Sequence, residues 1–344
     1  MALFNQPQNR KPAFLLALIA TALAIVVVGL GAFTRLTHAG LGCPDWPGCY
    51  GHVWAPQEDH EIARANAAFP DMPVQLDKTW PEMVHRYFAG SLVILTVAIL
   101  ALALKHRHKP AQPLKLPIFI LAFIILQALF GMWTVTLKLW PQVVTAHLLG
   151  GFTMLSLLWL LTLRLNNQNW RLDDRDVGRV ASLRAWTVIG LIVVAAQVSL
   201  GGWTTSNYAA LACPDFPTCH TQWLPEMDFA DGFNIFQHIG PNYLGGVMDN
   251  SARVAIHFAH RIGALITTVF VVALALRLFL LALPETRRMA AILIGVLIVQ
   301  LGLGISNIVF GFPLAVAVAH NLGGALLLLA FVTLNHRIFT AQPR

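Results

Sequence analysis

Residues 116–137 read LPIFILAFIILQALFGMWTVTL, a stretch that contains no Asp, Glu, Lys or Arg. A helix needs about 20 apolar residues to cross the hydrocarbon core of a bilayer. Among the other apolar stretches, 254–281 gives the weakest indication of a transmembrane helix, because Arg261 lies inside it. Uncharged stretches of this kind predict an all-α polytopic membrane protein with eight transmembrane helices, near 13–34, 81–104, 116–137, 142–163, 185–205, 254–281, 289–309 and 314–335.

The composition and the placement of charge support this class. Hydrophobic residues make up 57% of the 344 and charged residues 11%, whereas roughly a quarter of a soluble domain is charged. The net charge of +7 could indicate nucleic acid binding, but the basic residues cluster at 105–115 and 164–184, while 206–250 has none. This is the positive-inside pattern. It predicts that both termini are cytoplasmic, that the partner is membrane lipid and that no nucleic acid is bound.

The chain repeats itself at an offset of about 170 residues, the signature of an internal repeat. Residues 43–49 read CPDWPGC and 213–219 read CPDFPTC, while 146–151 read AHLLGG and 319–324 read AHNLGG. Four spans in each half give both halves the same orientation, so we expect two parallel-repeat four-helix bundles. The expected parts are an N-terminal half over 1–164 with an outer loop at 35–80, a cytoplasmic linker over 165–184, and a C-terminal half over 185–344 with an outer loop at 206–251.

Five of the thirteen histidines fall inside expected spans, and four of these are matched between the two halves: His85, His147, His260 and His320. An ionisable residue inside a span is costly and indicates function. One such histidine could simply be a hydrogen-bonding core residue, but these four form one pair in each half, at similar depth. Imidazole binds haem iron well, and facing helices of a bundle often build such sites. The pattern predicts two haem sites rather than zinc or copper, because neither half offers a third and fourth ligand nearby.

The two halves differ beside these histidines. Glu82 precedes His85 by three residues and shares its helix face, whereas His257 stands at that spacing from His260. A carboxylate at this place could act as a base or stabilise a developing positive charge. The alternative is a charge that only favours the positive end of the helix dipole. The difference predicts chemistry in the first half and a permanent cofactor in the second.

Arginines directly follow two of the proposed ligands, at Arg86 and Arg261. They could pair with haem propionates near the outer surface. The equal alternative is that their side chains extend to the membrane interface.

All four cysteines fall in the loops expected outside the cytoplasm, where disulfides persist. Five residues separate the members of each pair, and prolines stiffen the sequence between them. We predict a structural disulfide within each pair, with a redox or substrate-handling role for the first pair as the alternative. The cysteines are Cys43, Cys49, Cys213 and Cys219.

Together these motifs resemble those of the haem A synthases of bacteria and mitochondria, over nearly the whole chain. The likeness lies in EMVHR at 82–86, the two AHxxGG motifs, His260-Arg261 and the two CPxxPxC loops. It implies an oxidoreductase that converts the C8 methyl of haem O to the formyl group of haem A, for cytochrome oxidase. It also implies residue roles: haem b held by His260 and His320, substrate haem bound by His85 and His147, catalysis by Glu82, and a functional link for Cys43 and Cys49.

The resemblance further implies a bacterial plasma membrane as the location and haem O as the substrate. Haem O synthase, an electron acceptor and a further copy of the chain are candidate partners. The alternative function is a bis-histidine transmembrane cytochrome b that passes electrons without haem chemistry. It explains the four histidines equally well, but not the contrast between Glu82 and His257. A transporter built from parallel repeats ranks last, because it requires a polar pathway at the bilayer midplane.

Overall fold

The computed structural model describes residues 11–108, 113–167 and 169–344, which are mostly helical. In these ranges, eight helices are long and apolar enough to cross a membrane, which confirms the predicted all-α polytopic fold. The sixth of them continues unbroken through Arg261. The eight helices are α1 (Lys11–Leu36), α3 (Leu76–Lys105), α4 (Lys115–Thr136), α5 (Pro141–Asn166), α7 (Arg184–Ser206), α9 (Asn250–Leu280), α10 (Pro284–Val309) and α11 (Leu314–Phe339).

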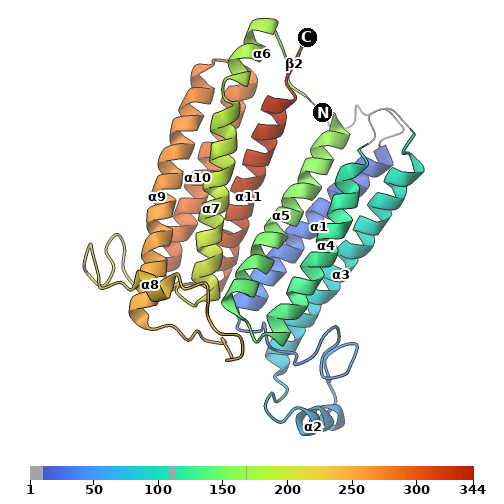
Figure 1. Cartoon of the computed structure of the whole chain (residues 1–344), viewed down its shortest axis with the longest axis vertical. Helices are drawn as coiled ribbons and strands as arrows, with labels where there is room; N and C mark the ends of the chain where they lie inside the picture. Colours follow the sequence, from blue (N-terminus) through green and yellow to red (C-terminus); the bar gives the residue numbers. More distant parts are fainter. Residues whose placement is uncertain (1–10, 109–112, 168) are drawn as a thin grey trace.

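The long helices form two groups of four that stand side by side (Figure 1). In the first group, α1 and α4 each contact both α3 and α5. In the second group, α7 and α10 each contact both α9 and α11. Each group is therefore a ring of four helices, in which α3 lies diagonally opposite α5, and α9 opposite α11. The groups meet where α5 packs against α7 and α11, and where α1 packs against α11.

Short elements mark the two ends of the molecule (Figure 1). The helices α2 (Asp59–Ala68) and α8 (Phe229–Gly232) lie at one end, which we call the loop end. The opposite end carries α6 (Asp174–Ala181) and two short parallel strands, β1 (Arg171–Leu172) and β2 (Gln342–Pro343). The strand pair ties the end of the chain to the segment between the two helix groups.

Two prolines near the starts of expected spans occupy different positions in their helices. Pro141 begins α5 and fits the first position, where its missing N–H costs nothing. Pro81, expected to begin the second span, instead lies inside α3, which starts at Leu76. The extra residues extend α3 beyond the apolar stretch toward the loop end, so hydropathy alone set the start of this helix too late.

A loop of the second group also covers part of the first group. The indole N–H of Trp140 donates to the main-chain oxygen of Gln237 at 3.1 Å. The amide of Gln142 donates to that of Ile235 at 2.9 Å. Both contacts are made at the start of α5, at the loop end. The sequence did not predict these contacts, because nothing in the repeat pairs the two segments.

Candidate functional site

His85 and His147 face each other inside the first helix group. They come from the diagonally opposed helices α3 and α5, and both are half-buried. Their ring centroids are 6.5 Å apart and the ring planes are 88° apart. Two imidazoles bound to opposite sides of one metal ion, each by a bond of about 2 Å, would have centroids roughly 6 Å apart. The pair therefore has the spacing of two axial ligands.

The second group has a corresponding pair. His260 on α9 and His320 on α11 are half-buried and lie on diagonally opposed helices. Among the described residues, no group of three or more His, Cys, Asp and Glu side chains could hold a metal ion alone. Two imidazoles per group fit a haem, because the porphyrin supplies the other four nitrogen ligands to the iron.

Each of the four rings packs against a glycine of a neighbouring helix. A Cβ atom on any of these glycines would come within 3.0 to 3.2 Å of Cε1 of the ring, tighter than nine in ten real contacts. Any larger residue in place of these glycines would therefore force the imidazole to shift by a few tenths of an ångström. The pairs are Gly31 with His85, Gly131 with His147, Gly201 with His260, and Gly304 with His320.

Glutamine side chains hold two of these histidines. Nε2 of Gln127 donates to the main-chain oxygen of His147 and lies 3.0 Å from its Nδ1. Gln197 makes the same two contacts with His260, each at 3.1 Å. The sequence analysis assigned no role to these glutamines. The signal that could have found them is a shared Gln-x-x-x-Gly motif, Gln127 with Gly131 and Gln197 with Gly201.

Glu82 is buried and is tied to the first disulfide loop. Its Oε2 accepts a hydrogen bond from the Cys43 N–H at 3.0 Å, and its Oε1 forms an ion pair with Arg86. In the second group, His257 takes the equivalent contact, with its Nδ1 3.2 Å from the Cys213 nitrogen that donates to it. Both groups therefore anchor the disulfide loop three residues before the histidine, but only the first does so with a carboxylate.

The two arginines hold the same loops. Their guanidinium groups donate to main-chain carbonyl oxygens of the loop residues, an arrangement that neither sequence alternative described. Arg86 contacts Asp45, Pro47 and Gly48, and Arg261 contacts Cys213, Asp215 and Thr218.

Both predicted disulfides are present, Cys43–Cys49 and Cys213–Cys219. An aspartate stabilises the turn of the second loop, where Asp215 accepts hydrogen bonds from the N–H groups of His220 and Thr221. The Thr218 hydroxyl, together with these N–H groups, holds the pKa of Asp215 below its usual value. Each bridge closes a short, stiff loop directly above a histidine pair.

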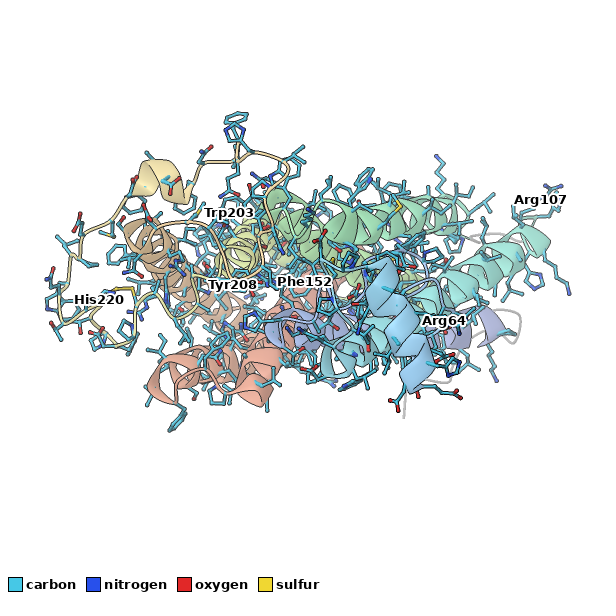
Figure 2. The ribbon with its side chains drawn as sticks, turned by 90° about the horizontal axis from the view of Figure 1, so that it is seen from below. Arg64, Arg107, Phe152, Trp203, Tyr208 and His220 are labelled. Carbon is cyan, nitrogen blue, oxygen red and sulfur yellow. A yellow bond between two sulfur atoms is a disulfide. The ribbon has the colours of Figure 1, made fainter. Side chains whose placement is uncertain are left out.

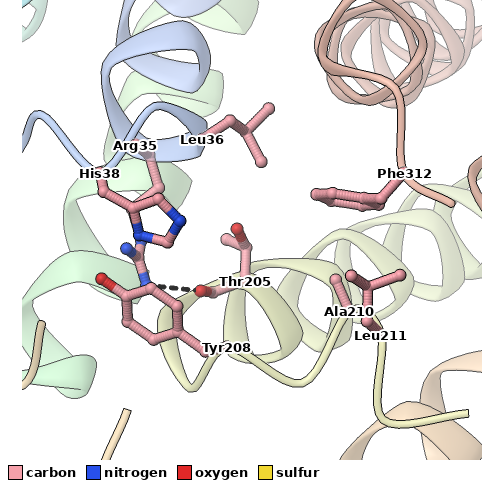
Figure 3. A pocket seen from close by; sticks show the side chains of 8 residues that line it. All are labelled: Arg35, Leu36, His38, Thr205, Tyr208, Ala210, Leu211 and Phe312. Atoms are coloured by element: carbon pink, nitrogen blue, oxygen red, sulfur yellow. Dashed lines mark hydrogen bonds between the residues drawn. The ribbon is translucent and has the colours of Figure 1, made fainter. Parts of the chain in front are cut away.

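A cavity of about 150 Å³ lies where the two groups meet (Figure 3). Arg35 donates to the main-chain oxygen of Thr205 at 2.6 Å, and its guanidinium lies 3.9 Å from the Tyr208 ring centroid. His38 stacks on the same ring. Seen from the loop end, Tyr208 lies between His220 of the second disulfide loop and Arg64 of α2 (Figure 2). The sequence analysis assigned no role to His38.

Comparison with known proteins defines the family. The model of the cytochrome oxidase assembly protein family (COX15-CtaA) matches residues 14–332. The protein named haem A synthase from Shewanella oneidensis is 48% identical over 318 residues, which are 92% of this chain and 94% of that protein. Proteins of the same name from Caulobacter vibrioides and Nitrosomonas eutropha are 26% and 28% identical. They match 95% and 94% of this chain, and 96% and 92% of their own lengths. The chain therefore belongs to the cytochrome oxidase assembly protein family, alongside bacterial proteins named haem A synthase.

Proposed function

We propose that this protein is a haem A synthase, a membrane oxidoreductase that converts the C8 methyl of haem O to the formyl group of haem A for cytochrome oxidase. One observation carries the proposal. The first helix group presents two imidazoles 6.5 Å apart, in a chain 48% identical to a protein of that name. The buried carboxylate of Glu82, on the same helix as His85, favours haem chemistry over electron transfer alone.

The two groups divide the work. His260 and His320 hold haem b, which supplies one-electron redox chemistry when bound. His85 and His147 take haem O as the substrate. The residue that binds the disulfide loop supports this assignment. It is the carboxylate of Glu82 in the first group and the neutral side chain of His257 in the second.

The reaction needs two successive two-electron oxidations of one methyl carbon. In the first, the carbon loses a proton and two electrons, and water adds with release of a second proton to give the alcohol. The second removes two electrons and two protons to give the aldehyde. An electron acceptor outside the chain takes the electrons.

The carboxylate of Glu82 stabilises the positive charge that develops at the carbon. Arg86 and the Cys43 N–H fix this carboxylate one helical turn from His85.

We place the protein in the bacterial plasma membrane with the loop end outside and both termini in the cytoplasm. Among the described basic residues of these loops, Lys105, Lys115, Arg164 and Arg184 lie at helix ends on the α6 side, as the positive-inside rule requires. The disulfides lie at the loop end, in keeping with an oxidising compartment. Haem O synthase, an electron acceptor and a second copy of the chain are the proposed partners.

Haem analysis tests the proposal. The protein is purified in detergent from cells that make haem O, and its haems are extracted, separated and identified by mass. We expect haem b together with haem O, its hydroxylated product or haem A. Two equivalents of haem b and nothing else, even with haem O supplied, would instead identify an electron-transfer cytochrome.

A further inference from the structure

The cavity at the interface between the helix groups is lined by a cation whose partners are all neutral. The guanidinium of Arg35 donates to the main-chain oxygens of Thr205 and Ser206, at 2.6 and 3.2 Å, and lies against the side chain of Tyr208. No acidic side chain among the described residues forms an ion pair with it. Taking a charge out of water is costly unless an opposite charge accompanies it. Arg35 therefore favours an anion in this cavity.

The other polar side chains of the cavity also suit an anion. Thr205 and Tyr208 carry hydroxyl groups that can donate a hydrogen bond, and so can the ring of His38. Arg35 and Lys78 both lie near enough to His38 to repel a proton on its ring, so the local charge is positive. The opposite side of the cavity is apolar and is formed by Ala210, Leu211 and Phe312 (Figure 3). A cation and hydrogen-bond donors that face an apolar wall suit a carboxylate carried on a larger apolar molecule.

The corresponding place in the first group is filled by protein. Leu41 and Leu139 match Leu211 and Phe312 at offsets of 170 and 173 residues, and they pack against the buried ring of Tyr243. Leu139 and Phe312 both have a positive φ, of 60° and 64°, as expected for the same position of a repeated turn.

The two outer loops account for this difference. Tyr243 belongs to the outer loop of the second group, which reaches over the start of α5. The outer loop of the first group folds α2 against its own disulfide instead. Beyond His38, no described residue of that loop lines the cavity. The fold thus keeps a polar cavity beside α11 where the matching place beside α5 is packed.

The cavity lies closer to the loop end than the histidine pairs do. Arg35 follows Gly31, which packs against the His85 ring, by four residues on α1, and Thr205 follows the corresponding glycine on α7 by four. Four residues of helix rise about 6 Å. Phe312 lies just before α11, which carries a histidine of the second pair. A haem has two propionate carboxylates at one edge, so a haem held by one of these pairs could bring a carboxylate to the cavity.

We propose that the cavity between the helix groups binds a carboxylate and that Arg35 is its counter-charge. Two sources share this chemistry. One is a propionate of a haem held by a histidine pair, and the other is a small free carboxylate that enters from the loop end. The haem as source rests on the proposed function, whereas the carboxylate site itself does not.

A cycle of two protein forms and two ligands tests the first source. The parent protein and Arg35→Gln are loaded with haem b or with its dimethyl ester, in which both carboxylates are blocked, and transfer to apomyoglobin is timed. Arg35→Gln should release haem b about 10- to 100-fold faster than the parent protein does, the effect of losing a hydrogen bond to a charged group. The two proteins should release the ester at equal rates. A general loosening of the interface would instead speed the release of both ligands alike.

Acetate tests the second source. Thermal unfolding is measured in chloride and in acetate at equal ionic strength. If a free carboxylate binds, acetate should raise the unfolding midpoint of the parent protein, because a ligand stabilises the state that binds it, and should leave that of Arg35→Gln unchanged. A difference between haem b and its ester that depends on Arg35, or an acetate effect that depends on Arg35, supports the site. Absence of both would overturn the proposal.

Arg261→Gln is the matched control. Its guanidinium donates to carbonyl oxygens of the disulfide loop, so any faster release should be the same for haem b and the ester. If Arg35→Gln does not fold, Ala210→Phe is measured instead, because it places a large side chain in the cavity and leaves Arg35 unchanged. It should give the pattern expected of Arg35→Gln. A parent protein that binds no haem would reject the proposed function, and the acetate measurement would still decide whether the carboxylate site exists.

Discussion

The two helix groups share one plan, and the residue that anchors the disulfide loop beside the histidine pair differs between them. Both groups place two histidines on opposed helices, anchor a disulfide loop above them and hold that loop with an arginine. The first group has Glu82 where the second has His257. In the function that we propose, this difference in charge separates the group that takes the substrate from the group that holds the cofactor.

Removal of one histidine from each group in turn should give the largest difference in haem content between the two groups. His260→Ala should lose haem b and with it all conversion, because loss of a ligand costs more than the 10- to 100-fold that loss of a supporting group costs. His85→Ala should keep haem b but lose tight binding of haem O. Haem content per chain measures both. Retention of haem b in His260→Ala would show that the assignment of the two sites is reversed.

The charge of Glu82 can be separated from its anchoring role. In Glu82→Gln, the amide oxygen can still accept the Cys43 N–H, so the loop and the haem content should be unchanged. Conversion of haem O should fall by about 100- to 1000-fold, because charge stabilisation is lost. His257→Gln is the matched variant and should convert normally. Equal conversion by Glu82→Gln and the parent protein would leave the carboxylate with a structural role only.

Substitution of the glycines beside the histidine rings should have a smaller effect on haem binding. Gly201→Ala should displace His260 and weaken haem b binding by about 10-fold, since its Cβ would lie 3.2 Å from the ring. Gly31→Ala should weaken haem binding in the first group by at least as much, because its Cβ would lie 3.0 Å from the His85 ring. Haem retention on dilution compares the two variants. Full retention in both variants would mean that the rings move aside without loss of haem binding.

The disulfides should matter least for conversion. Replacing either pair with serine should cost about 2 kcal/mol of stability, the value for a short closed loop, and thermal unfolding in detergent measures it. Cys43→Ser/Cys49→Ser should also lower conversion, because the Cys43 N–H positions Glu82. Cys213→Ser/Cys219→Ser should not. Equal effects of the two double variants on conversion would remove the functional distinction between the loops.

The sequence predicted the features that depend on local signals. The eight spans follow from uncharged length, and the two disulfides follow from short spacing within each loop. The pairing of His85 with His147 also followed, because the repeat gave each half one histidine pair.

Features that depend on packing between helices were not predictable in the same way. The contact of Gly31 with the His85 ring joins residues that no spacing rule relates. The loop carbonyls that receive Arg86 could not be foreseen either, because their positions depend on the fold of the disulfide loop.

The stack of His38 on Tyr208 has a bearing on how such a chain arose. Each of these residues precedes the first cysteine of its loop by the same spacing, so the contact joins corresponding positions of the repeat. In a symmetric dimer of identical halves, an isologous interface would make a residue at this place meet its own copy. Fusion into one polypeptide removes that constraint, so an arginine and a histidine on one side can face a threonine and a tyrosine on the other (Figure 3). Covalent duplication thus permits different side chains on the two sides of the interface between the helix groups. In the same way, it permits the two histidine sites to carry different neighbouring residues.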